Sequence, residues 1–155
     1  MSKTGVGPLF GCLALILSGA LVWIHLANKE KYLIRWLSVW VASAVSAVFI
    51  VVGLFLWCSS AFKIFESIET NTLNTSGAYG IVRNPIYSGI FHVLTGILIM
   101  FRSYIVLPAP FIIYGMLRYL VTYEEEELLK RFGDEFIEYK KQVNAVFPTL
   151  RKLFK

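Results

Sequence analysis

The chain has 155 residues, of which 57% are hydrophobic and only 16% are charged, with a formal net charge of +5. Soluble domains carry about a quarter of their residues as charged ones, so this composition excludes an ordinary soluble domain. It indicates an all-α protein, a polytopic helical bundle that forms a single membrane domain over residues 1–155.

Two uncharged stretches near the N-terminus, 4–28 and 36–62, exceed the roughly 20 residues that a helix needs to cross a bilayer. The first is longer than the apolar part of a cleaved signal sequence and has no clear cleavage site, so we expect it to be retained. Both carry small residues at helical spacing: Ala14 with Ser18, and Ala42 with Ser46. This spacing predicts that the two helices pack on each other as a scaffold pair within residues 1–58.

Residues 59–83 contain the turn-rich stretch NTLNTSGAYG, which predicts a cytosolic connector. Residues 84–123 are expected to form a hairpin of two further spans. Asn84 is a good helix N-cap and Pro85 suits the first helical position. The free N–H groups and the positive dipole end of this helix, next to Arg83, would then favour an anion such as a carboxylate or phosphate.

The third predicted helix has one thin face, formed by Pro85, Gly89, His92 and Gly96. Two interpretations stay open: another helix packs against the glycines, or a ligand lies there. His92 is accordingly either a hydrogen-bonded interior histidine or a ligand contact. No second ligand lies at metal-binding spacing from it, so we predict no metal site.

The fourth predicted helix is interrupted by one charge, Arg118, which should face the bundle interior or a watery cavity because a charge in an apolar helix is costly. Glu125 lies two turns further on and would pair with Arg118 directly or through a ligand, provided that the helix continues past Tyr123. If the helix ends there, the run 124–127 is only the solvated start of the next helix.

Residues 124–155 are expected to form an amphipathic helix or helix pair on the membrane surface, broken near Gly133 and stopped before Pro148. With four spans, ten Lys and Arg residues fall on the side of the termini and four, Lys29, Lys31, Arg35 and Arg102, on the other. This asymmetry favours N- and C-termini in the cytosol. The basic tail would contact anionic membrane lipids rather than nucleic acid.

Two polar clusters, Arg83 on one side and Glu124 with Glu125 on the other, would thus flank a cavity near the cytosolic membrane face. A zwitterionic cofactor that carries a nucleoside would match both. Aromatic side chains are available to stack on an adenine or face a sulfonium: Tyr79, Tyr87, Tyr123, Phe136 and Tyr139.

The blocks GAYGIVRNPIYSG and EEEELLKRFGDEFIEYKKQVNAVFP, within about residues 73–148, resemble the isoprenylcysteine carboxyl methyltransferase family and the related phospholipid methyltransferases. The resemblance implies a membrane enzyme that binds S-adenosylmethionine. The contacts that it implies are Tyr79, Arg83, Asn84, Tyr87, Gly89, Glu124 and Glu125. We add His92 and Tyr139 as candidate cofactor contacts from their positions. Asn84 stands where the eukaryotic enzymes have histidine, and Gln142 and Ala145 occur where relatives often carry an arginine.

We therefore expect methyl transfer to a small lipophilic or lipid-linked acceptor. None of the candidate residues is an obvious general base, which favours an acceptor that is already nucleophilic, such as a carboxylate oriented by Arg118 as the catalytic residue. Two alternatives remain: an NADPH-dependent enzyme resembling sterol reductases, and a non-catalytic membrane protein that binds lipid or a partner.

Overall fold

The computed structural model describes residues 7–70 and 72–149, with side chains for 7–60 and 72–149. Some of the basic residues counted above lie outside the described residues or side chains: Lys3, Lys63, Arg151, Lys152 and Lys155. Within the described ranges the regular structure is helical, and one isolated β-bridge joins Leu33 to Ser103. The prediction of an all-α fold is confirmed for this part of the chain.

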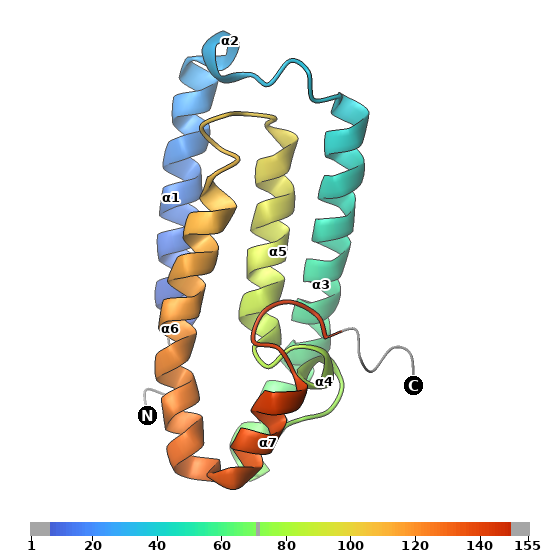
Figure 1. Cartoon of the computed structure of the whole chain (residues 1–155), viewed down its shortest axis with the longest axis vertical. Coiled ribbons are helices and arrows are strands. Elements are labelled where there is room, and N and C mark those ends of the chain that lie inside the picture. The colour runs from blue at the N-terminus through green and yellow to red at the C-terminus, as the bar shows by residue number, and fades with distance from the viewer. Residues whose placement is uncertain (1–6, 71, 150–155) are drawn as a thin grey trace.

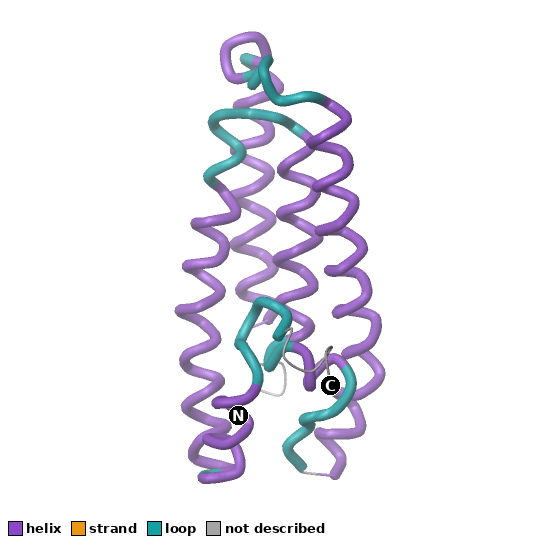
Figure 2. Tube along the Cα trace, turned by 45° about the vertical axis from the view of Figure 1, so that its right-hand side comes forward, coloured by secondary structure: helices purple, strands orange, loops and turns teal. Residues whose placement is uncertain are grey.

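Four long helices run side by side in alternating directions (Figure 1). They are α1 (Gly7–Ala27), α3 (Val39–Thr70), α5 (Pro85–Met100) and α6 (Ala109–Phe132). Three short helices lie at the ends of this bundle: α2 (Lys29–Tyr32), α4 (Ala78–Ile81) and α7 (Asp134–Gln142). Figure 2, turned by 45°, shows the loops gathered towards the two ends. The helix that carries RNPIYSG and the helix that carries EEEE therefore meet at the same end.

The outward faces of the bundle are apolar, which indicates a membrane protein. Two segments, Gly7–Ala27 and Val39–Ser60, are long and apolar enough to cross a bilayer. Large apolar side chains lie on the surface, among them Trp40, 85% exposed, and Phe111 on α6, 80% exposed. Exposed apolar surface of this extent is unfavourable in water and is typical of a membrane or interaction surface. Helix α5 has 16 residues, fewer than the about 20 of an average span. The count of four spans stays a prediction.

The prediction that the first two long helices form a pair is wrong, because α3 packs along α5 while α1 packs against α6 and α5. Glycines set the close approach of α3 and α5. A Cβ built on Gly89 would lie 2.8 Å from the Gly53 carbonyl oxygen, and one on Gly96 would lie 2.8 Å from the Ser46 carbonyl oxygen. The Ser46 hydroxyl also donates to the Gly96 carbonyl at 2.7 Å. The small residues of α3 thus accommodate α5 and not α1.

Helix boundaries agree with the sequence at two places and differ at two. Helix α5 begins at Pro85, and Gly133, with φ of +51°, separates α6 from α7. Helix α3 continues to Thr70 and so occupies the first part of the predicted connector 59–83. Helix α6 runs to Phe132, past the expected boundary between 84–123 and 124–155, as the alternative of a continuing helix required. Because α6 continues, Glu124 and Glu125 lie inside a helix and not at a solvated helix start.

Candidate functional site

The C-terminal segment 143–149 closes one end of the bundle by running along the start of α5. The Arg83 amide donates to the Asn144 carbonyl at 2.8 Å, and the Asn84 amide donates to the Ala145 carbonyl at 3.2 Å. These backbone bonds hold segment 143–149 against the residues that lead into α5.

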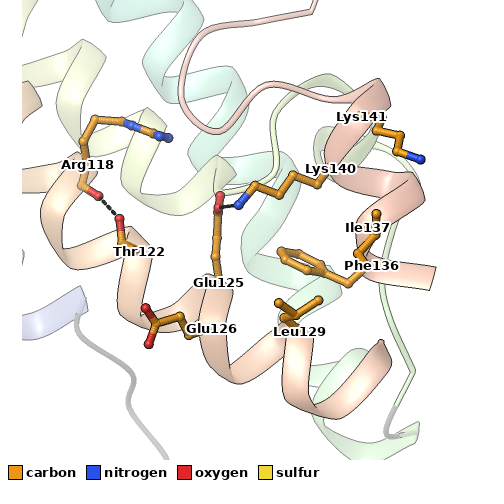
Figure 3. A pocket seen from close by; sticks show the side chains of 9 residues that line it. All are labelled: Arg118, Thr122, Glu125, Glu126, Leu129, Phe136, Ile137, Lys140 and Lys141. Carbon is orange, nitrogen blue, oxygen red and sulfur yellow. Dashed lines mark hydrogen bonds and ion pairs between the residues drawn. The ribbon is translucent and has the colours of Figure 1, made fainter. Parts of the chain in front are cut away.

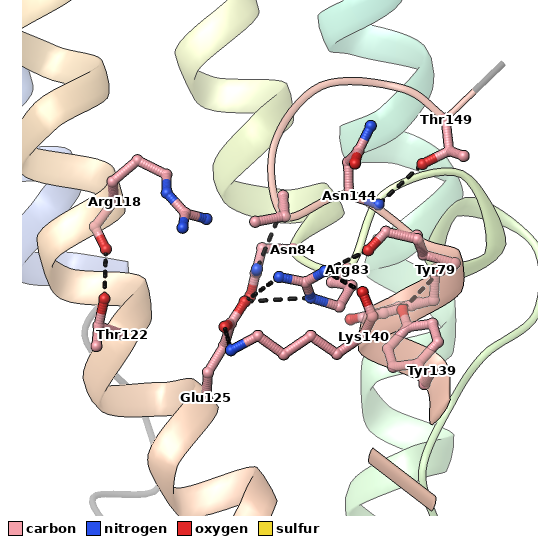
Figure 4. A network of polar contacts seen from close by, with 12 residues as sticks. Tyr79, Arg83, Asn84, Arg118, Thr122, Glu125, Tyr139, Lys140, Asn144 and Thr149 are labelled. Atoms are coloured by element: carbon pink, nitrogen blue, oxygen red, sulfur yellow. Dashed lines mark hydrogen bonds and ion pairs between the residues drawn. The ribbon is translucent and has the colours of Figure 1, made fainter. Parts of the chain in front are cut away.

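A buried ion-pair network lies at the centre of this end (Figure 4). Arg83 donates from Nη2 to Glu125 Oε1 at 2.6 Å and from Nε to the same oxygen at 3.1 Å. Lys140 Nζ contacts Glu125 Oε2 at 2.7 Å. The side chains of Arg83 and Glu125 are only 8% and 7% exposed. One carboxylate thus joins the start of α5, α6 and α7.

The remaining donors of Arg83 also contact protein, which corrects the sequence-based interpretation in two respects. Its Nη1 donates to the carbonyls of Lys140, at 3.1 Å, and of Val143. Arg83 is therefore engaged by protein acceptors and is not a free cation beside the helix start. The direct Arg118–Glu125 pair is absent from the described part of the chain, because Arg83 and Lys140 reach Glu125 instead.

Burial alone would raise the pKa of the Glu125 carboxyl, but the hydrogen bonds and charges of Lys140 and Arg83 outweigh burial and hold this pKa below its usual range. Glu125 lies beyond the apolar part of α6, near the end of the bundle. The carboxylate is therefore ionised at neutral pH, as the network requires.

This depressed pKa predicts an acid-sensitive fold. A carboxyl whose pKa is lower in the folded chain than in the unfolded chain stabilises the fold at pH values above its unfolded pKa, about 4.5. The fold loses this stabilisation as the pH falls through the pKa of the folded chain. We expect the melting temperature in non-ionic detergent to decline below about pH 4.5 in the wild type and to decline less in Glu125→Gln. Glu127→Gln, which changes an exposed carboxylate of the same helix, serves as control. Equal acid dependence of Glu125→Gln and wild type would contradict the prediction.

A second pair of candidate residues meets beside this network. The Tyr87 hydroxyl donates to Glu124 Oε1 at 2.7 Å. The Tyr87 ring packs against the start of α1, where a Cβ on Gly7 would come within 2.8 Å of Tyr87 Cε1.

Tyr139 of α7 and Tyr79 of α4 form a further contact. The Tyr139 hydroxyl donates to the Tyr79 carbonyl at 2.6 Å. Burial raises the pKa of the Tyr139 phenol, so the hydroxyl keeps its proton and remains a donor.

Asn84 occupies the N-cap position of α5, but its side chain does not cap the helix. The Asn84 amide nitrogen Nδ2 instead donates to the Ala145 carbonyl at 3.3 Å. One turn later, the fully buried Ser88 hydroxyl donates to the Val146 carbonyl. The predicted capping bond is thus replaced by contacts that hold segment 143–149 over the helix start.

Gly89 and His92 lie where α5 contacts α3, away from the carboxylates. Gly89 packs against the backbone of α3, as described above. His92 is 5% exposed, its Nδ1 lies 2.7 Å from the Ser88 carbonyl oxygen, and its ring stacks on Phe49 of α3 at 5.7 Å. Of the two interpretations of this thin face, these contacts support helix packing and an interior histidine.

Two cavities adjoin the network, and Arg118 lines both. The α7 cavity, of about 510 Å³, lies between α6 and α7 (Figure 3). It is lined by Arg118, Thr122, Glu125, Glu126, Leu129, Phe136, Ile137, Lys140 and Lys141. The Tyr114 cavity, of about 390 Å³, lies between α6 and segment 143–149. It is lined by Arg83, Tyr114, Arg118, Asn144, Ala145, Val146 and Phe147.

Sequence reasoning missed Lys140 and segment 143–149. The sequence shows Lys140 only as one cation of a basic tail, whereas the break at Gly133 turns α7 back so that Lys140 reaches Glu125. Gly133 predicts the break, but no pattern in the neighbouring residues predicts the direction of α7 after it. Among the described residues, no group of three or more His, Cys, Asp or Glu side chains is placed to hold a metal ion.

No protein-family model matches the chain, and no solved structure matches it. The chain is 33% identical over 87 residues to the human protein-S-isoprenylcysteine O-methyltransferase, and 33% identical over 91 residues to those of mouse and rat. Each match covers 56% of this chain but 31% of the relative, so the chain spans about a third of the length of the curated relatives it matches. The resemblance carried by the two sequence blocks is thereby confirmed: over slightly more than half its length the chain is similar to protein-S-isoprenylcysteine O-methyltransferases.

Proposed function

We propose that the chain is a membrane methyltransferase that uses S-adenosylmethionine to methylate a small lipophilic or lipid-linked acceptor, a carboxylate or a similar nucleophile. One observation carries the proposal: the two sequence blocks of the resemblance meet in one polar cluster, Arg83 with Glu125 and Tyr87 with Glu124. The relatives' names describe O-methyltransferases, which favours this reaction over the nicotinamide-dependent alternative.

The chemistry of the cluster fits the proposed cofactor. S-adenosylmethionine carries hydroxyls and an amino group, which would donate hydrogen bonds to the carboxylates of Glu124 and Glu125. It also carries a carboxylate, for which Arg83 and Asn84 are the nearby donors. In this structure Arg83, Asn84 and Glu125 hold protein partners, so the cofactor would share or replace those contacts. Tyr79, Tyr87 and Tyr139 supply aromatic surface around the same group. Gly89 and His92 would act by fixing α5 against α3. When bound, the cofactor supplies an activated methyl group on sulfur.

The chain's own residues would then orient the acceptor and exclude water. No histidine is among the described residues that line the two cavities, and Glu125 is already engaged by two cations. These cavity linings therefore offer no histidine to act as general base for an acceptor that must first lose a proton. A carboxylate is already ionised at neutral pH and needs no general base, which supports a carboxylate acceptor.

We also propose that the protein is multi-pass, with four spans and both termini in the cytosol. The alternating directions of α1, α3, α5 and α6 bring the start of α1 and helix α7 to the same end of the bundle (Figure 1). The positive charges around the site, with Arg83 and Lys140 among them, favour that end for the cytosolic side. The site would then face both the cytosol, which supplies the cofactor, and the bilayer, which supplies the acceptor.

Ligand-dependent melting tests the proposed function. We expect S-adenosylhomocysteine, the demethylated product, to raise the melting temperature of the detergent-solubilised protein, with about 2.7 kcal/mol of stabilisation at 100 times its Kd. NADPH should have no effect. Glu124→Gln should weaken the response to S-adenosylhomocysteine, because it removes the charge of a proposed cofactor contact. Glu124 is only half-buried, so the substitution does not alter the core.

Lys130→Gln provides the matched control, since it removes an exposed charge from the same helix and should leave the response unchanged. Stabilisation by NADPH alone would replace the proposal with the reductase alternative. Stabilisation by neither compound would favour a non-catalytic membrane protein. Transfer of a labelled methyl group into a membrane lipid extract, followed by fractionation, would then identify the acceptor.

A further inference from the structure

Exposed tryptophans gather at the end of the bundle opposite the candidate site. This end holds α2 and the loops that join α1 to α3 and α5 to α6 (Figure 1). Three of the four tryptophans of the chain lie here and are 72% to 85% exposed: Trp23 near the end of α1, Trp36 in the loop before α3, and Trp40 at the start of α3. An indole combines an apolar body with one N–H donor, which favours the boundary between the hydrocarbon core and the headgroups of a bilayer. The tryptophans therefore indicate that this end lies in a membrane interface.

The fourth tryptophan agrees with this depth. Trp57 lies near the other end of the apolar part of α3, Val39–Ser60, and is also exposed. Trp40 and Trp57 are 17 residues apart on one helix, a rise of about 26 Å. The hydrocarbon core of a bilayer is roughly 30 Å thick. A bilayer around α3 would thus place these two indoles in its opposite interfaces.

The two loops at the tryptophan-rich end are joined into one surface. The Ile34 amide donates to the Arg102 carbonyl at 2.7 Å, and the Tyr104 amide donates to the Tyr32 carbonyl at 3.0 Å. Arg102 Nη2 donates back to the Ile34 carbonyl at 3.3 Å. The Trp36 indole N–H donates to the Tyr104 hydroxyl at 3.2 Å. Side chains of the two loops therefore hold fixed positions relative to one another.

This surface carries positive charge that the protein does not neutralise. Glu30 is the only acidic residue of α2 and the two loops, all of which the structure describes, and it pairs with Arg35 at 2.8 Å. Lys29 and Lys31 are exposed, and neither ammonium has a hydrogen bond or ion pair with a described residue. The Lys31 ammonium lies 5.4 Å from the centroid of the Tyr32 ring, a contact that leaves its charge in place. Two lysines beside exposed indoles match an anionic surface that is apolar just below its charges.

We propose that this end of the bundle docks on the anionic phospholipid headgroups of the leaflet around it. The docking residues, called here the α2 surface, are Trp23, Trp36 and Trp40 at the depth of the interface and Lys29 and Lys31 at the depth of the phosphates. The inference goes beyond the proposed function, because the α2 surface lies away from both the candidate site and the basic C-terminal tail. An acidic soluble protein would match the lysines but leave the three indoles in water.

Docking at the α2 surface has a consequence for the candidate site. Helix α3 and its neighbours connect the two ends of the bundle as rigid elements. Holding the α2 surface at headgroup depth in one leaflet therefore also fixes the depth of the polar cluster in the opposite interface.

Quenching of tryptophan fluorescence by brominated lipids tests the inference. In Trp57→Phe the remaining tryptophans all belong to the α2 surface, so the fluorescence reports on this end alone. The probes are brominated phosphatidylglycerol and brominated phosphatidylcholine, each in increasing fractions in phosphatidylcholine bilayers that contain the reconstituted full chain. We expect the anionic lipid to be preferred about three- to tenfold at low salt. High salt should reduce this preference, because it screens exposed charges.

Lys29→Gln combined with Lys31→Gln, in the Trp57→Phe background, should lower the preference to near one. Lys130→Gln is the matched control, because it removes an exposed positive charge at the other end of the bundle and should keep the preference. Both α2 lysines are exposed, so the double variant should keep the melting temperature of its Trp57→Phe parent in detergent.

Three outcomes would overturn the inference: equal quenching by the two brominated lipids in Trp57→Phe, an undiminished preference in the double lysine variant, and quenching by aqueous acrylamide but by neither lipid. The last result would place this end in water, where a soluble acidic partner would be the better match. Stabilisation by S-adenosylhomocysteine should be the same in the double lysine variant and its parent, so a failure of the proposed function would be seen separately.

Discussion

Replacing Arg83 with glutamine is expected to destabilise the fold by about 3–5 kcal/mol, the usual cost of removing one partner from a buried ion pair. The variant leaves Glu125, 7% exposed, with Lys140 as its remaining cation. It also removes the donor of the Lys140 and Val143 carbonyls. Thermal unfolding in detergent, followed by circular dichroism, measures the loss.

A double-mutant cycle identifies the cause of this destabilisation. Because Arg83 and Glu125 contact each other directly, Arg83→Gln combined with Glu125→Gln should lose less stability than the sum of the two single variants. Arg35→Gln is the control, since Arg35 pairs with Glu30 at 2.8 Å but both side chains are at least 75% exposed. That change should cost less than about 1 kcal/mol. Additive effects of Arg83→Gln and Glu125→Gln would contradict a direct buried pair.

The second large effect is expected at the contact between α3 and α5. Gly89→Val should destabilise the protein by about 1–3 kcal/mol, because the new side chain meets backbone that cannot move aside cheaply. A Cβ at this position would lie 2.8 Å from the Gly53 carbonyl oxygen and 3.0 Å from the Trp57 amide nitrogen. Melting temperature is again the measurement.

Gly115→Val on α6 is the matched control, because a Cβ there meets no atom within 4 Å. This comparison also tests the other interpretation of the thin face of α5. If the glycines made room for a ligand and not for α3, Gly89→Val would leave the melting temperature unchanged and abolish the stabilisation by S-adenosylhomocysteine.

The contacts of Arg83 and Arg118 give these two arginines different roles at the same end of the bundle. Arg83 is enclosed by acceptors from α6, α7 and segment 143–149 and acts as a tie between them. Arg118 reaches the same region from α6 and finds no described partner. The first is a determinant of stability, and the second is available to a ligand.

Much of the local structure follows from the sequence by itself. Pro85 starts α5 because proline lacks the N–H that a first helical residue leaves unpaired, and Gly133 separates α6 from α7 because its φ of +51° is strained for other residues. The residues that form the polar cluster, Arg83, Glu124 and Glu125 among them, were also identifiable from their motifs. These features depend on intrinsic preferences of a few neighbouring residues.

Which helices and side chains meet was decided by the folded chain. Helical spacing places small residues on one face of α3, but it does not say that α5 and not α1 packs there, because both helices offer small residues. Likewise, Glu125 pairs with Arg83 and Lys140, 42 residues before it and 15 after it, rather than with Arg118 on its own helix. Periodicity defines the faces of a helix, whereas pairing across such separations depends on how α7 and segment 143–149 fold back, which no local preference specifies.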